Sequence, residues 1–149
     1  MRDRKRILAL LLFLGAGPAL ATAQSAKPDP CEKATNQAEM NDCYGREYQK
    51  DDARLNRVYH KAMDYLQHDL AQAATDQALK QSAQTAVEDL KAAELAWIKY
   101  RDLQCEAAGH QYEGGTMQSM IHSICMSTVT EHRIDEIRQA YENGERKLE

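Results

Sequence analysis

Apolar residues recur every three or four positions along most of the chain, which is the pattern of amphipathic helices. The first such run extends from about residue 36 to about residue 70 without a proline. Asn36, followed three positions later by Glu39, gives it a start that resembles a capping box. The apolar stripe of this predicted helix consists of Met40, Tyr44, Tyr48, Leu55, Tyr59, Ala62, Leu66 and Leu70.

Two further helices follow with the same period. The second is predicted to start at Thr75 or Asp76, to run as far as Cys105 and to be stopped by Gly109, and Thr116 is expected to cap the third. The apolar stripe of the second helix is Leu79, Ala83, Ala86, Leu90, Ala93, Trp97 and Tyr100. That of the third helix is Met117, Met120, Ile124, Thr128, Ile134, Ile137 and Tyr141.

No segment alternates apolar and polar residues as a half-buried strand would, so the pattern indicates an all-α fold. Short connections place neighbouring helices antiparallel. We therefore predict an antiparallel bundle of three main helices over residues 36–149. A Gly-flanked loop from His110 to Gly115 joins the second and third helices.

The first 23 residues have the features of a secretory signal peptide. Arg4, Lys5 and Arg6 precede the apolar run Ile7–Leu14, and Ala21–Ala23 offers small residues for cleavage after Ala23. This apolar run is too short for a membrane span, which needs about 20 residues. We expect a periplasmic or secreted protein in which residues 24–35 form a polar lead-in before the helical domain.

Export changes the interpretation of the four cysteines, because an even number in an oxidising compartment favours disulfides. Their separations of 12, 62 and 20 positions do not match paired metal ligands, and no Cys-x-x-Cys motif occurs. The antiparallel arrangement gathers all four at one end of the bundle. Of the three possible pairings we favour Cys31 with Cys43 and Cys105 with Cys125, because each closes a local loop.

One acidic residue interrupts the apolar stripe of the first helix. Asp52 lies four residues after Tyr48, where an apolar residue is expected. At 1.5 Å per residue, Asp52 and Arg133 come to similar heights on parallel helices. We hypothesise a partly buried Asp52–Arg133 pair beside Trp97, which would fix the helix register. The alternative is that Asp52 is simply exposed to solvent beside Asp51.

Charge and motifs narrow the range of functions. Residues 1–23 carry a net charge of +3, so the formal total of −4 leaves −7 for residues 24–149. An acidic domain disfavours nucleic acid as a partner but not a basic protein. The chain contains no nucleophile elbow, phosphate-binding loop or His-Glu-x-x-His motif, and its five histidines never occur four apart. We expect no enzymatic activity, no cofactor and no metal site.

Three sequence blocks and a closing signature resemble the lysozyme inhibitor LprI-like family. The blocks are residues 39–43, 52–59 and 96–105, and the closing signature is Cys125 followed by Thr130, Arg133 and Ile134. The match runs from about residue 31 to residue 141, which is nearly the whole of the chain expected after signal-peptide cleavage, and one departure is Glu94, where members often carry Gln. The residues of these blocks that we interpret as a structural motif are Asp52, Leu55, Asn56, Tyr59, Trp97, Tyr100, Arg101 and Arg133.

This resemblance implies a secreted or periplasmic helical domain with disulfides and, for the member that names the family, inhibition of lysozyme. Inhibition would then act by occlusion of the lysozyme cleft without chemistry. The loop from His110 to Gly115 is the candidate for filling the cleft, since functional contacts favour loops on a rigid scaffold. His110, Tyr112 and Thr116 are the candidate contacts with a basic lysozyme. Two alternatives stay open: an envelope-associated interaction module with another protein partner, and a small bundle that carries a metal or ligand through its histidines. The sequence leaves the oligomeric state undetermined.

Overall fold

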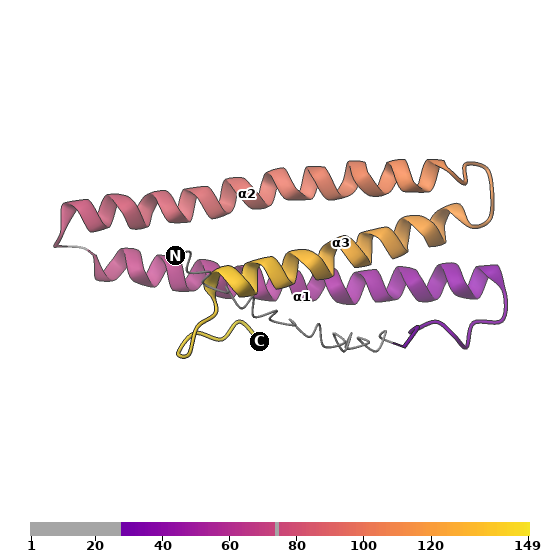
Figure 1. Cartoon of the computed structure of the whole chain (residues 1–149), viewed down its shortest axis with the longest axis horizontal. Coiled ribbons are helices and arrows are strands. Elements are labelled where there is room, and N and C mark those ends of the chain that lie inside the picture. Colours follow the sequence, from indigo (N-terminus) through magenta and orange to yellow (C-terminus); the bar gives the residue numbers. More distant parts are fainter. Residues whose placement is uncertain (1–27, 74) are drawn as a thin grey trace, which may run out of the picture.

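Three α-helices make up the computed structural model, which describes residues 28–73 and 75–149. They are α1 (Gln37–Gln72), α2 (Gln77–His110) and α3 (Gln118–Tyr141). Figure 1 shows α1 and α2 as a long antiparallel hairpin, with the shorter α3 running back beside them. The predicted all-α, three-helix bundle is therefore confirmed. The predicted signal peptide and the first residues of the lead-in lie outside the described residues.

Side-chain caps start the first two helices where the sequence indicates. The Asn36 side chain accepts a hydrogen bond from the backbone N–H of Glu39 at 3.0 Å. Glu39 in turn accepts from the backbone N–H of Thr35 at 2.8 Å, which lowers the pKa of its carboxyl. Asp76 caps α2 by accepting from the N–H groups of Ala78 and Leu79. These caps satisfy N–H groups that have no partner within the helix.

The connection between α2 and α3 differs from the prediction at both ends. The helix α2 continues through Gly109, which is buried where it faces α3; an added Cβ would lie 3.5 Å from the Cβ of His122. Thr116 does not cap α3, whose N-cap is Met117 with no side-chain hydrogen bond. Instead, the Thr116 carbonyl accepts a hydrogen bond from the Asn41 side chain at 3.1 Å. This bond ties the loop to α1.

The apolar core lies along the middle of α1 and the second half of α3. It consists of Leu55, Val58, Ala62, Met63, Leu66, Leu90, Ile134, Ile137 and Leu148. The last of these comes from the segment after α3, which turns back toward α1 (Figure 1). The Tyr65 hydroxyl donates to the carbonyl of Lys147 at 3.0 Å, and Arg146 pairs with Asp69 at 2.6 Å. The C-terminal segment thus covers core residues that α3 does not reach.

Parts of the two later apolar stripes are wrong. Tyr100 is 56% exposed, Ala93 and Thr128 are also exposed, and the buried face of α2 continues instead through Glu94 and Arg101. Helical periodicity identifies the buried face by its apolar residues. Where the buried face carries polar residues, the period instead connects apolar residues that are exposed.

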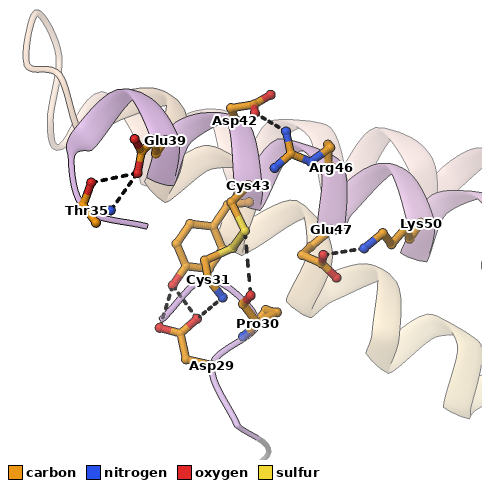
Figure 2. Close-up of a disulfide and its surroundings, with 11 residues drawn as sticks. Asp29, Pro30, Cys31, Thr35, Glu39, Asp42, Cys43, Arg46, Glu47 and Lys50 are labelled. Carbon is orange, nitrogen blue, oxygen red and sulfur yellow. Dashed lines mark hydrogen bonds and ion pairs between the residues drawn. A yellow bond between two sulfur atoms is a disulfide. The ribbon is translucent and has the colours of Figure 1, made fainter. Parts of the chain in front are cut away.

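Both favoured disulfides are present: Cys31–Cys43, with a Cα–Cα distance of 5.9 Å, and Cys105–Cys125, at 5.4 Å. All four cysteines lie at the end of the bundle that carries the α2–α3 loop, as expected. Figure 2 shows Cys31 held against the first turns of α1, with Asp29 accepting from the Cys31 N–H at 2.8 Å. The disulfides therefore join the lead-in to α1 and α2 to α3.

Replacing Cys105 and Cys125 together by Ala should lower the free energy of unfolding by about 3 kcal/mol, because the unfolded chain regains the freedom of the loop that the bond closes. Urea denaturation monitored by circular dichroism measures the change. The matched control is the double variant Cys31→Ala/Cys43→Ala, which opens a loop of only 12 residues rather than 20 and should cost less. An unchanged urea midpoint in the first variant would contradict the stabilising role of the second disulfide.

Candidate functional site

Two arginines stack on one indole ring in the centre of the bundle. The Arg101 guanidinium carbon lies 5.1 Å from the centroid of Trp97, and that of Arg133 lies at 5.8 Å. Arg101 is also 5.6 Å from the ring of Tyr48 on α1. Cation–π attraction is strongest with Trp and increases as the groups lose contact with water. The stack therefore joins side chains from all three helices.

Each arginine has carboxylate partners, but they are not the predicted ones. Asp52 pairs with Arg101 at 2.9 Å, and Arg133 pairs with Glu94 at 3.0 Å. The hypothesised Asp52–Arg133 pair is wrong, although Arg133 does lie beside Trp97. The reason is that Glu94, Trp97 and Arg101 occupy one face of α2, so α2 supplies a partner to each neighbouring helix.

The electrostatics of this cluster favour a structural role. Glu94 and Arg101 are each 7% exposed. Burial by itself would lower the pKa of Arg101, but hydrogen bonds to Asp102 and Asp52 outweigh it and raise the pKa above its ordinary value. The same balance between burial and the hydrogen bonds to Glu136 and Glu94 raises the pKa of Arg133. Both guanidiniums stay charged and hold helices together.

Sequence reasoning missed the role of Glu94, which it treated only as a departure from the family. The available signal was its spacing: residues 94, 97 and 101 recur at helical steps on one face. An acidic residue there, three before a predicted core Trp, points to a basic partner on another helix.

The other residues of the structural motif follow α1. Leu55 is buried in the core, and the side chain of Asn56 donates to the backbone carbonyl of Asp52 at 3.0 Å. Asp52, Leu55, Asn56, Tyr59 and Arg101 all line a groove of about 380 Å³ between α1 and α2. Tyr100 lies outside this arrangement.

The three candidate partner-binding residues lie in or beside the loop at the tip of the bundle. We call residues 110–116 the tip loop. His110 is the last residue of α2, Tyr112 is 41% exposed, and Thr116 is exposed just before α3. Two acidic side chains flank His110: Glu106 at 3.7 Å and Glu113 at 3.9 Å. The tip loop therefore presents an aromatic ring next to polar and acidic groups.

The tip loop has a defined backbone. The N–H of Tyr112 donates to the carbonyl of Gly109, and the N–H of Gly115 donates to the carbonyl of Tyr112, each at 2.9 Å. Gly114 has a φ of 74°, a conformation that side chains disfavour. Beside the loop lies a cavity of about 500 Å³ to which all three helices contribute. The tip is thus an ordered surface with a hollow next to it.

In the part of the chain that the structure describes, no three His, Cys, Asp or Glu side chains come together as metal ligands would. Among the helices of residues 28–73 and 75–149, none combines the length and apolarity of a membrane span.

Fold and site together define a small, disulfide-stapled three-helix domain with an ordered polar tip. The family model of lysozyme inhibitor LprI matches residues 30–137, a range that includes both disulfides, the Trp97 stack and the tip loop. The chain belongs to this family of lysozyme inhibitors. It is also 38% identical over 148 residues to a protein of Rhizobium meliloti (strain 1021) described as uncharacterized, covering 97% of this chain and 99% of that relative. No solved structure matches the chain.

Replacing Glu94 by Ala should lower the free energy of unfolding by about 3 kcal/mol, because the half-buried Arg133 loses its less exposed partner. The matched control is Glu136→Ala, which removes the more exposed partner of the same arginine, Arg133, and should cost less than about 1 kcal/mol. Urea denaturation of the two variants gives the comparison. Equal destabilisation by both would show that the Glu94–Arg133 contact adds nothing beyond a surface ion pair.

Proposed function

We propose that this protein inhibits a lysozyme by inserting its tip loop into the substrate cleft, without chemical change to either protein. Membership of the lysozyme inhibitor family supports a lysozyme as the protein that is bound. The observation that carries the mechanism is the exposed Tyr112 on an ordered loop at the extreme end of an elongated bundle (Figure 1). A convex tip of this kind fits a concave partner.

The rigidity of the tip supports occlusion. Ordering a flexible loop on binding costs affinity, and a loop that is already ordered avoids this cost. The Cys105–Cys125 disulfide joins the helices on either side of the tip loop, and Asn41 holds the carbonyl of Thr116 from α1. The loop therefore meets a partner in a conformation that is already fixed.

Charge supports a basic partner. Animal-type lysozymes are basic proteins, and residues 24–149 carry a net charge of −7, as derived above. Opposite net charges steer association and make it sensitive to salt. The cleft of such a lysozyme contains two carboxyl groups, to which His110, Tyr112 and Thr116 offer hydrogen-bond donors. Glu113 would be unfavourable there and is expected to remain in solvent.

The proposed location is the periplasm or the outside of the cell. Lysozymes act on the cell envelope, and two disulfides with no free cysteine in the described residues are typical of oxidising compartments. In this proposal residues 1–23 are a signal peptide removed after Ala23, residues 24–35 are a lead-in and residues 36–149 are the inhibitory domain.

The double variant His110→Ala/Tyr112→Ala should inhibit lysozyme at least about tenfold more weakly, a loss of about 1.4 kcal/mol. Inhibition constants come from the clearing of a bacterial cell suspension with several lysozymes, at low and high salt. The control is Tyr100→Ala, which removes a similarly exposed tyrosine from the side of α2. If the double variant inhibits as well as the unchanged protein, the tip loop is not the inhibitory element.

One observation favours the second candidate, an envelope-associated interaction module. Leu95 and Leu103 of α2 are 64% and 62% exposed, and large apolar side chains that are exposed near one another can mark a surface that binds another protein. A protein partner on the side of the bundle would cover them. This surface is separate from the tip loop, so the two candidates predict different sensitive residues.

Under the second candidate, Leu95→Ser/Leu103→Ser should abolish chemical cross-linking of the exported protein to an envelope protein in intact cells, while His110→Ala/Tyr112→Ala should leave it unchanged. Lysozyme activity should be unaffected by the unchanged protein at every salt concentration. This candidate would be rejected if the protein inhibits lysozyme and if the leucine substitutions leave the cross-linking unchanged.

A further inference from the structure

The cavity beside the tip loop has a lining suited to a positively charged side chain. Its volume of about 500 Å³ falls in the range of ligand sites in proteins. We propose that it is a socket for one arginine side chain of the bound lysozyme, next to the cleft that the tip loop enters. This inference rests on the proposed function and adds a second contact to it.

The lining of the cavity contains a carboxylate and no basic side chain of Lys or Arg. Glu106 is the acidic residue of the cavity wall, and neither Lys nor Arg contributes to the wall. The imidazole Nε2 of His110 lies 3.7 Å from the Glu106 carboxylate, and no Lys or Arg of the described residues pairs with that carboxylate. A guanidinium that reaches Glu106 therefore meets a carboxylate that no arginine or lysine of the protein itself occupies.

The lining also provides hydroxyl oxygens that can accept hydrogen bonds. Ser119 and Ser123 lie one turn apart on α3 and both face the cavity. Their side chains make no hydrogen bond to other residues in the described part of the chain, and neither does the Thr116 hydroxyl. Guanidinium presents five N–H donors and needs several acceptors, which one carboxylate and these three hydroxyls supply.

Two glycines, Gly109 and Gly115, belong to the wall of the cavity. A Cβ at Gly115 would lie 3.1 Å from the carbonyl oxygen of Tyr112, so a side chain here would require the tip loop to shift by a few tenths of an ångström. The same residues thus shape the loop and the socket. A partner that contacts Tyr112 is placed to fill the cavity at the same time.

The test uses acetyl-arginine methylamide as the probe and its uncharged citrulline counterpart as the reference. In heteronuclear NMR titrations at pH 8, the arginine probe should shift the amide signals of Ser119, His122 and Ser123, and the citrulline probe should not. Glu106→Gln should weaken probe binding at least about tenfold, and Glu88→Gln, the same charge change farther back along α2, should leave it unchanged. Glu106 is 66% exposed on its side chain, so its replacement is compatible with folding, which circular dichroism verifies.

Two results would overturn the socket: an arginine probe that leaves these signals unchanged, or equal binding by Glu106→Gln and the unchanged protein. Lysozyme inhibition, measured with the same proteins, is a separate readout. Inhibition without probe binding rejects the socket and leaves the proposed function intact. Probe binding that depends on Glu106, without inhibition of any lysozyme, rejects the proposed function and supports a socket for an arginine of another basic protein.

Discussion

The stack of Arg101, Trp97 and Arg133 is the constraint on which the arrangement of the three helices depends. Each guanidinium is taken out of water and must meet its carboxylate, Asp52 from α1 or Glu94 from α2. Sliding one helix by a turn would separate Arg101 from Asp52 or Arg133 from Glu94, and would leave each arginine only the more exposed carboxylate on its own helix, Asp102 or Glu136. Losing the less exposed partner of a largely buried charge is costly. Apolar side chains alone tolerate small shifts better, because their attraction has no direction. The stack therefore selects one alignment of the helices.

This alignment determines what lies at the tip. With α1, α2 and α3 fixed relative to one another, Asn41 reaches the carbonyl of Thr116 and Gly109 packs against His122. The Cys105–Cys125 disulfide then secures the two helices that carry the tip loop. The shape of the proposed inhibitory surface and of the cavity beside it thus depends on contacts in the centre of the bundle, which lie several helical turns away from the tip.

Helical periodicity predicted the three helices, the capping pattern predicted the Asn36 cap, and the closing of local loops predicted both disulfide pairs, because these features depend on local sequence and on short loops. The pairing of Asp52 with Arg101 could not be predicted in this way, since the period shows which face a residue occupies but not which side chain opposes it. Buried polar residues such as Glu94 give no signal in a search for apolar stripes. The roles of His110, Tyr112 and Thr116 stay predictions, because the function of an exposed side chain depends on the partner that it contacts.

Both disulfides lie at one end of the molecule, whereas the opposite end holds the α1–α2 turn, beyond the reach of α3 (Figure 1). Local opening is governed by the contacts that each region must break. Amide hydrogens should consequently exchange with solvent slowest along the apolar core in the middle of the bundle, and the end without a disulfide, around the α1–α2 turn, should open more readily than the cross-linked end. A molecule built in this way concentrates its thermal fluctuations far from the tip loop, which is the surface proposed to bind the partner.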